Sequence, residues 1–208
     1  MEMTPLKQMT AVQIDKAVAD YRTLLEKHSE EFDSEVVETV LGQSKLAQEQ
    51  FQVFRACVEA ISNCIIRKVK VNRSLTPQQA IDATCRTKYL NDEVVREMPM
   101  GEGEEVDLYL IPFKKKLAVD DLEKEVDKAG FVLVDPITLC ALNEQEPTLA
   151  DTFPNATQWR DKNGKACCAY FGRWGDGRKV DVYRLDSDWL GSWFFGCVRK
   201  QSAEVSGS

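Results

Sequence analysis

The chain has 208 residues, of which 43% are hydrophobic and 29% charged, and its formal net charge is −7. These values are typical of one large or two small globular domains with a sizeable core, and they exclude a uniformly basic nucleic-acid-binding protein. No apolar run approaches eighteen residues and the first thirty residues are polar, so we expect a soluble, unexported protein of the cytoplasm. Seven cysteines, an odd number, favour reduced thiols over a disulfide framework.

The acidity is concentrated in the middle of the chain. Residues 76–153 contain 8 Lys and Arg against 17 Asp and Glu, which is a net charge of −9. Residues 1–75 contain 10 against 11, or −1, and residues 154–208 contain 9 against 6, or +3. We therefore expect the acidic surface of the protein to lie in the middle segment.

Residues 1–75 are expected to form a helical arm. Apolar side chains in residues 10–29 recur at steps of three and four, which places them on one helical face. Residues Ser34–Lys70 continue such a pattern for four heptads, which is typical of a coiled coil. Asp33 or Ser34 is the expected N-cap of this second, longer helix, and the two helices should fold into an antiparallel hairpin.

The longer helix carries the candidate self-association residues. The first helix is too short to cover the whole apolar stripe, so the remainder must pack against the rest of the chain or against a second copy, as in a homodimer. The proposed self-association positions are Val40, Ala47, Phe51, Phe54, Val58, Ile61 and Ile65. The basic run Arg67, Lys68, Lys70 and Arg73 is expected at the end of this helix, where cations complement the helix dipole.

Residues 76–200 are expected to form a small α+β domain, followed by a disordered tail at 201–208. Thr76, Pro77 and Gln79 predict the start of a helix that runs to about Arg86, and further helices are expected over 91–98, 120–130 and from Asp135 to Leu142. Strands are expected over 106–112 and 131–134 because the side chains there alternate or are continuously apolar.

The segment from Thr157 onward predicts an antiparallel β-meander that ends with a strand at 193–198. Asn163-Gly164 and Gly175-Asp-Gly177 supply its turns. This segment holds all four tryptophans, which could form the core of the sheet or a recognition surface. Trp174, Trp189 and Trp193 are the candidates for recognition. Arg173, Arg178 and Lys179 around the second turn form a weak candidate anion-binding group, for which a charged hairpin tip is the simpler interpretation.

Residues 76–200 resemble a group of bacterial and phage-borne proteins that have no known activity. The features that carry the resemblance are Gly101 to Glu105, Asp135-Pro136, Asn143-Glu144, Gln158 to Asp161, and Gly196 to Lys200. The Trp-rich ending is the most specific of these. The resemblance implies a bacterial or phage-borne origin and no mechanism, and it does not cover the helical arm.

Catalytic chemistry finds little support in the composition. The single histidine, His28, lies on an apolar helical stripe, and general acid–base catalysis most often uses histidine. Cys167 and Cys168 are adjacent, so their side chains face opposite sides of a strand and cannot bind one metal ion together. The sequence therefore predicts no enzyme, no metal site and no cofactor.

Three hypotheses remain for function. The first is a non-enzymatic protein-binding or regulatory protein with a self-associating arm. The second is an acidic, nucleic-acid-mimicking inhibitor of a host nuclease or another nucleic-acid-binding complex, and the third is a metal-dependent hydrolase that uses the acidic cluster. For partner binding by the acidic segment the candidate residues are Glu102, Glu104, Glu105 and Asp107, and no direct nucleic-acid or membrane binding is expected.

Overall fold

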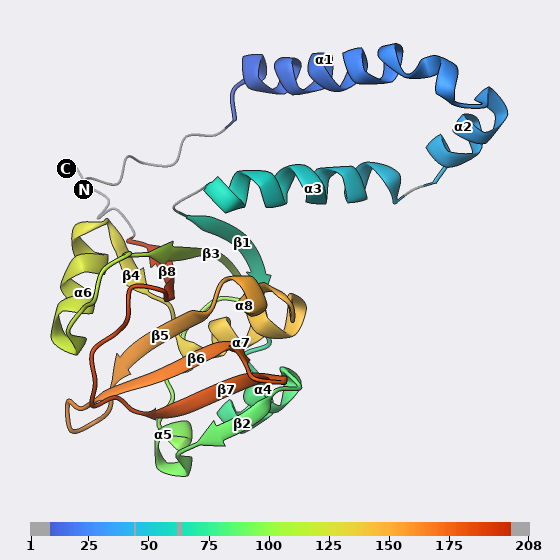
Figure 1. Ribbon diagram of the computed structural model, residues 1–208. Coiled ribbons are helices and arrows are strands. Elements are labelled where there is room, and N and C mark those ends of the chain that lie inside the picture. Colours follow the sequence, from blue (N-terminus) through green and yellow to red (C-terminus); the bar gives the residue numbers. More distant parts are fainter. Residues whose placement is uncertain (1–8, 44, 62–63, 201–208) are drawn as a thin grey trace, which may run out of the picture. The chain divides into compact units, whose positions relative to one another are not determined.

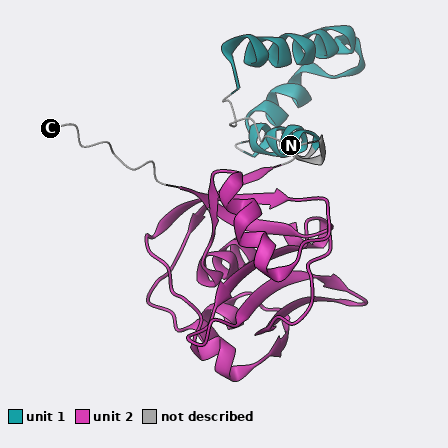
Figure 2. Cartoon of the chain, turned by 90° about the vertical axis from the view of Figure 1, so that its left-hand side faces the viewer, with its two compact units in different colours: residues 1–61 teal, residues 62–208 magenta. Residues whose placement is uncertain are grey.

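The computed structural model describes residues 9–43, 45–61 and 64–200, and the tail expected at 201–208 lies outside the described residues (Figure 1). The fold is mixed α+β. The chain divides into two compact units, residues 1–61 (unit 1) and 62–208 (unit 2), drawn in separate colours in Figure 2. The boundary expected at residue 75 therefore lies inside unit 2. No helix in the described ranges has the length and apolar character that crossing a membrane requires.

Unit 1 is helical in its described part. It contains α1 (Ala11–Lys27), the short 3-10 helix η1 (Ser29–Glu31), α2 (Ser34–Leu41) and α3 (Leu46–Ile61). Thr10 caps α1, and Asp33 caps α2 as expected by accepting hydrogen bonds from the backbone of Glu35 and Val36. The single helix expected over Ser34–Lys70 is wrong, because it is interrupted after Leu41. Gly42 follows at that point, and glycine disfavours the helix interior.

The end of the expected long helix is a strand. β1 (Ile65–Lys70) has alternating burial, with Ile65, Arg67 and Val69 facing the interior of unit 2. The basic run therefore does not cap a helix. Arg67 instead donates from Nε to Glu146 Oε1 at 2.7 Å, which ties β1 to the C-cap of α7 (Pro136–Gln145).

Unit 2 is built on an eight-stranded sheet, with the order β1-β3-β8-β5-β6-β7-β2 and with β4 also paired to β8. The strands after β1 are β2 (Thr87–Leu90), β3 (Glu105–Pro112), β4 (Phe131–Leu133), β5 (Asn155–Arg160), β6 (Ala166–Trp174), β7 (Gly177–Arg184) and β8 (Phe194–Arg199). The helices are α4 (Pro77–Ala83), α5 (Asp92–Arg96), α6 (Val119–Lys128), α7 (Pro136–Gln145) and α8 (Leu149–Thr152).

Helix starts in unit 2 follow their capping residues. Thr76 and Gln79 form the expected capping box of α4, Asn91 caps α5, and the Asp135 side chain accepts a hydrogen bond from Thr138 N at the start of α7. Helix α4 ends at Ala83 rather than near Arg86, and β2 follows where no strand was expected. Side-chain acceptors at the first turn thus fix these boundaries more firmly than apolar spacing does.

The C-terminal strands depart from a simple meander. Strands β5, β6 and β7 are consecutive and antiparallel, with turns at the expected glycines. Strand β8 does not extend this series beside β7. It returns across the sheet to lie between β3, to which it is antiparallel, and β5, to which it is parallel. The closing strand therefore joins the two halves of the sheet.

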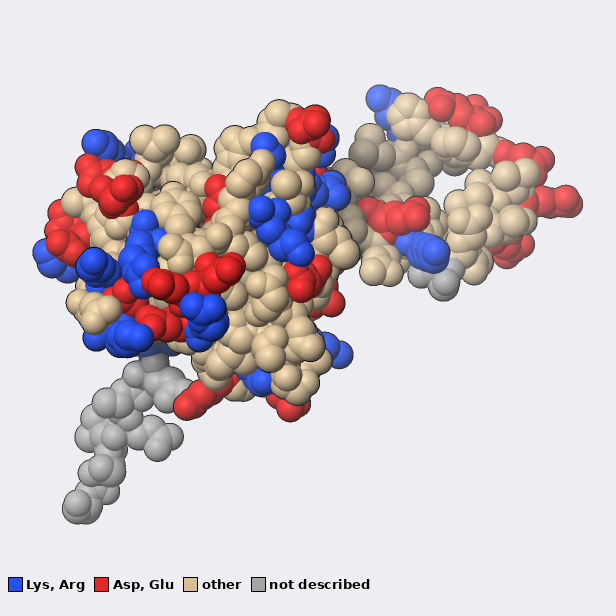
Figure 3. Space-filling model, turned by 90° about the horizontal axis from the view of Figure 1, so that it is seen from below, with Lys and Arg blue, Asp and Glu red and all other residues tan. Residues whose placement is uncertain are grey.

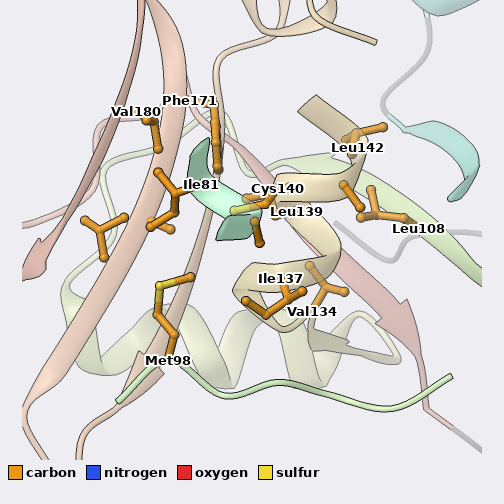
Figure 4. Close-up of a cluster of buried hydrophobic side chains, with 14 of the residues drawn as sticks. Ile81, Met98, Leu108, Val134, Ile137, Leu139, Cys140, Leu142, Phe171 and Val180 are labelled. Carbon is orange, nitrogen blue, oxygen red and sulfur yellow. The ribbon is translucent and has the colours of Figure 1, made fainter. Parts of the chain in front are cut away.

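Helices cover most of one face of the sheet, which we call the inner face. A single apolar cluster joins side chains of α4, α5, α7 and α8 to inward-facing residues of β1, β3, β6 and β7. In Figure 4, Ile81 of α4 and Leu139 and Cys140 of α7 lie beside Phe171 and Val180 of the sheet. Helix α6 lies on the opposite, outer face, because Gln158 reaches Val119 O from there, and it stands apart from α4 and α7 in Figure 1.

Candidate functional site

Unit 1 exposes its apolar side chains. Phe54 and Val58 of α3 are 42% and 50% exposed, and Val18 of α1 is 63% exposed. The further exposed large apolar residues of this unit are Met9, Val12, Ile14, Tyr21, Leu24, Leu25, Phe32, Val36, Val37, Val40, Leu41, Phe51 and Val53. Soluble chains rarely leave this many large apolar side chains in water without a partner. A hydrogen bond from Gln50 Nε2 to the Tyr21 hydroxyl connects α3 to α1.

The structure separates the predicted self-association residues into two groups. Val40 lies on α2, and Ala47, Phe51, Phe54 and Val58 lie on α3, all of them exposed. The side chain of Ile61 lies outside the described residues. Ile65 was assigned wrongly: it is 1% exposed and lies on β1, opposite Leu110 of β3. A residue buried in the core of unit 2 cannot contribute to a helical interface.

The outer face of β6 and β7 is lined by aromatic and polar side chains. Successive residues of a strand point to opposite faces, so Cys167, Ala169 and Phe171 enter the inner core while Cys168 and Tyr170 face outward. On β7, Asp181 and Tyr183 are the cross-strand neighbours of Tyr170 and Cys168. The Tyr170 hydroxyl donates a hydrogen bond to Asp181 Oδ2.

Ring contacts join this face into one cluster, which we call the outer aromatic cluster (Tyr170, Trp174, Tyr183, Trp193). The ring of Tyr170 lies 5.5 Å from Trp174, 5.8 Å from Tyr183 and 4.9 Å from Trp193, measured between centroids. Gly172 makes this packing possible, because a Cβ there would lie 2.5 Å from Cη2 of Trp174. Trp174 is 36% exposed, so the cluster reaches the surface.

The predicted recognition tryptophans therefore have different roles. Trp174 and Trp193 belong to the outer aromatic cluster, whereas Trp189, which contacts the Trp193 ring from beneath, is 3% exposed and also packs on Phe195. The Trp189 Nε1 donates to Gln158 Oε1 at 2.8 Å, as a satisfied core side chain does. Recognition by Trp189 is thus not supported, because its ring and its donor are already buried and bonded.

Burial perturbs the titratable groups of the outer face. Desolvation raises the pKa of Asp181, and it raises the pKa of the Cys168 thiol to about 12. Burial and the bond to Asp181 together raise the pKa of Tyr170 well above its usual range. The second oxygen of Asp181, Oδ1, is buried and has no hydrogen-bond partner. The face therefore presents aromatic rings around a carboxyl whose pKa is raised by burial.

Sequence reasoning missed three members of this face. Tyr170, Asp181 and Tyr183 carry no motif, but their period-two alternation with the apolar residues Ala169, Val180 and Val182 would have placed them together opposite the core.

The acidic segment is held by Arg73. Its guanidinium donates to the backbone carbonyls of Met100, Glu102 and Gly103 and to the carboxylate of Asp135. The side chains of Glu102, Glu104, Glu105 and Asp107 are exposed, as the inhibitor hypothesis requires.

Basic residues face part of this acidic segment across the sheet. Lys68 and Lys70 lie directly opposite Asp107 and Glu105 on the neighbouring strand. In the view of Figure 3, Lys and Arg are interspersed with Asp and Glu over unit 2. The acidic residues thus form part of a mixed-charge surface rather than a uniformly negative one.

The candidate anion-binding group is already engaged. Arg178 binds the carboxylate of Asp151 through Nε and Nη2, and Arg173 lies 3.6 Å from the same carboxylate. Lys179 lies over the ring of Tyr89, with Nζ 5.6 Å from the centroid. Asp151 supplies a counter-charge to Arg173 and Arg178, so these two side chains have a structural role that requires no bound anion.

In the described ranges no group of three or more His, Cys, Asp or Glu side chains is placed to hold a metal ion. Comparison of the chain with family models, curated proteins and solved structures finds no match. Function is therefore inferred from the surfaces described above.

Proposed function

We propose that this protein is a non-enzymatic protein-binding protein whose unit 1 self-associates through a coiled-coil-like helical hairpin and whose unit 2 binds a partner. The single observation that carries the proposal is the exposure of the large apolar side chains of α1, α2 and α3. Seven free cysteines suit a reducing compartment, so we place this activity in the cytoplasm.

The energy available to unit 1 supports self-association. Full burial of a Val, Leu, Ile or Phe side chain is worth about 1.5–3 kcal/mol. Phe54 and Val58 are about half exposed, so covering each would contribute about 1 kcal/mol per copy. Both lie on one face of α3, four residues apart, and Phe51 lies three residues before Phe54. This is the spacing that a helix presents to a helical partner.

Unit 2 supports partner binding through the outer aromatic cluster. Tyrosine and tryptophan dominate the energetics of protein interfaces because they cover large areas at low entropy cost. Tyr89, 53% exposed, extends the aromatic surface to β2, where it lies opposite Asp181 of β7. Leu190, 61% exposed, lies in the loop that carries Trp193. These side chains form a surface of the composition that protein partners recognise.

The test compares two variants of α3. Phe54→Glu with Val58→Glu removes about 2 kcal/mol of burial per copy, or about 4 kcal/mol per dimer, so the dissociation constant should rise about 1,000-fold. Val53→Glu is the matched control, because Val53 is 66% exposed and lies on the opposite side of α3. Light scattering should show monomer for the double variant and an unchanged assembly for the control. Equal behaviour of both proteins would refute an interface on this face.

A further inference from the structure

Two arginines lie directly opposite each other near the tip of the β6–β7 hairpin. Arg173 of β6 and Arg178 of β7 are partners in the antiparallel ladder. Each lies two residues from a strand residue that enters the inner core, Phe171 and Val180 respectively, so both arginine side chains project from the inner face. Like charges in directly opposed positions destabilise a sheet. The pair therefore requires negative charge beside it.

One carboxylate lies beside the pair. Arg178 binds Asp151 through Nε at 2.9 Å and through Nη2 at 2.8 Å, whereas Arg173 Nη1 lies 3.6 Å from Asp151 Oδ2. The hydrogen bond from Arg178 lowers the pKa of Asp151, so this carboxyl is ionised at neutral pH. Within the described part of the chain, no other carboxylate forms an ion pair with either guanidinium.

A third arginine, Arg86, lies buried nearby and is 5% exposed. Its guanidinium donates to three neutral oxygens, which belong to Asn143, Pro147 and Gly172. Its Nε is buried without a hydrogen-bond partner. The charge of Arg86 is therefore not balanced by direct contact with a carboxylate, and it adds to the positive potential around Asp151.

The charges at the hairpin tip do not cancel. The three arginines act together on Asp151, which sets three positive charges against one negative charge. Asp176 and Lys179 lie on the same tip and offset each other. The tip therefore has an excess of two positive charges.

Hydrogen-bond donors remain available on the two hairpin arginines. Arg173 is 49% exposed and, among the described residues, has no acceptor closer than Asp151 Oδ2 at 3.6 Å. Arg178 is 34% exposed, and Asp151 occupies its Nε and Nη2 but leaves Nη1 to solvent. Two guanidinium groups on neighbouring strands thus present unused donors at the surface. Guanidinium groups bind phosphate and carboxylate oxygens through pairs of parallel hydrogen bonds.

Charge and donor number favour a phosphate group over a carboxylate. A phosphate monoester carries a charge of about −1.5 to −2 at neutral pH and has three acceptor oxygens. This charge matches the excess at the tip, and each of the two arginines can bind an oxygen of its own. A carboxylate brings a single negative charge and two oxygens, so it would leave part of the excess uncompensated.

We propose that Arg173 and Arg178 bind the phosphate group of a phosphate monoester or of free phosphate. Arg173 contributes its whole guanidinium and Arg178 contributes Nη1, while Arg86 strengthens binding through its charge alone. The site lies on the inner side of the sheet, opposite the outer aromatic cluster, and it does not depend on unit 1. Its failure would leave the proposed function standing.

The probes are inorganic phosphate, a capped phosphoserine tripeptide (Ala-pSer-Ala) and acetate, each titrated into the ¹⁵N-labelled full chain at neutral pH and constant ionic strength. We expect saturable NMR shifts of the Nε–H resonances of Arg173 and Arg178, with a dissociation constant of about 1 mM for at least one phosphate probe. Acetate should bind about tenfold more weakly or not at all. Tighter binding of the peptide would identify a phosphorylated partner, and tighter binding of inorganic phosphate a free phosphate; both support the site.

Three variants separate this site from general attraction to positive charge. Arg173→Gln should weaken phosphate binding about tenfold, because it removes charge-assisted hydrogen bonds. Lys179→Gln is the matched control, since it removes one charge from the same tip on the opposite face, where Lys179 lies over Tyr89; it should change binding by less than about twofold. Asp151→Asn removes the repelling carboxylate and should tighten binding about threefold.

If Asp151→Asn does not fold, the comparison of Arg173→Gln with Lys179→Gln decides. The proposal is overturned if no phosphate probe gives saturable shifts, if acetate binds as tightly as phosphate, if the Arg173 and Lys179 variants lose affinity equally, or if a folded Asp151→Asn protein binds phosphate more weakly than the unmodified chain.

Discussion

Arg73 is the residue whose removal should most disturb the acidic segment. Its Nη1 and Nη2 atoms bind Asp135 at 2.8 and 3.2 Å, and Nη2 also donates to Thr138 Oγ1 at 2.8 Å. Its other donors hold the carbonyls of residues 100, 102 and 103. The two side chains of the ion pair are only 17% and 13% exposed. Arg73 therefore joins the end of β1, the loop before β3 and the start of α7.

We expect Arg73→Ala to destabilise unit 2 by about 3–5 kcal/mol, the cost of leaving one member of a buried ion pair without its partner. For a unit of this size, 1 kcal/mol lowers the melting temperature by about 2–4 °C, so the loss should be about 10 °C. Arg73→Lys keeps the charge but cannot supply the planar fork of donors, and it should cost about half as much. Asp135→Asn keeps the acceptor that caps α7, and Arg73 keeps its bonds to three backbone carbonyls, so the cost should be smaller still.

Urea unfolding monitored by tryptophan fluorescence is a suitable assay, because Trp159, Trp174, Trp189 and Trp193 all lie in unit 2. A double-mutant cycle of Arg73→Ala with Asp135→Asn should give a coupling energy above about 1 kcal/mol. A loss below about 1 kcal/mol for Arg73→Ala, or additive effects in the cycle, would refute the view that this pair organises the acidic loop.

Three further predictions follow from the outer face and the thiols. Gly172→Ala should cost about 1–3 kcal/mol in urea unfolding, because its Cβ would meet the Trp174 ring. Gly177→Ala, whose Cβ would lie no nearer than 4.0 Å to Thr87 Oγ1, is the control, and equal losses would contradict the packing. Burial raises the pKa of Asp181 above its ordinary 3.8, so the folded chain holds this proton to higher pH than the unfolded chain does. The free energy of unfolding should therefore fall as pH rises from the unfolded-state pKa to the folded-state pKa of Asp181. Asp181→Asn should remove this fall, and parallel stability–pH curves for the two proteins would contradict it. A thiol reagent should modify Cys57 and Cys85 rapidly and the other five cysteines only on unfolding, and a rapidly reacting third thiol would contradict their burial.

The sequence predicted helix starts and turns correctly where the hydrogen-bond donor and acceptor lie within a few residues of each other in the chain. The helix starts predicted at Thr76 and Asp135 each place a side-chain acceptor within three residues of the amide it binds. The glycine turns between β5 and β6 and between β6 and β7 are local in the same sense. Such features depend on a few neighbouring residues, so reading them requires no knowledge of the tertiary structure.

The apolar spacing from Val37 to Ile65 wrongly predicted one continuous helix, because a helical period and a strand period overlap at its end. Val58 and Ile61 continue a heptad spacing to Ile65, but Ile65, Arg67 and Val69 alternate in burial as a strand does. The antiparallel pairing of β1 with β3 decides between the two, and β3 lies some forty residues further along the chain. A contact so distant in sequence leaves no trace in local spacing.

Strand β2 and the position of β8 between β3 and β5 were not predicted, because both depend on pairing between strands far apart in the sequence. Tyr89 and its neighbours are largely exposed, and β2 is held by a parallel ladder to β7. Strand β8 reads as the next strand of a meander, but it pairs with β3 and β5 instead. The candidate site could be predicted only in part for the same reason. The tryptophans were visible in the sequence, but the burial of Trp189 and the contacts of Tyr170 depend on this crossover.

Self-association through unit 1 is tested most directly by the mass of the unmodified chain in solution. Sedimentation equilibrium over a dilution series should give a mass that is a multiple of 23.6 kDa at high concentration and that falls on dilution, because apolar side chains such as Phe54 and Val18 are covered only in the assembly. A constant 23.6 kDa throughout the series, with these side chains still in water, would contradict the proposed function.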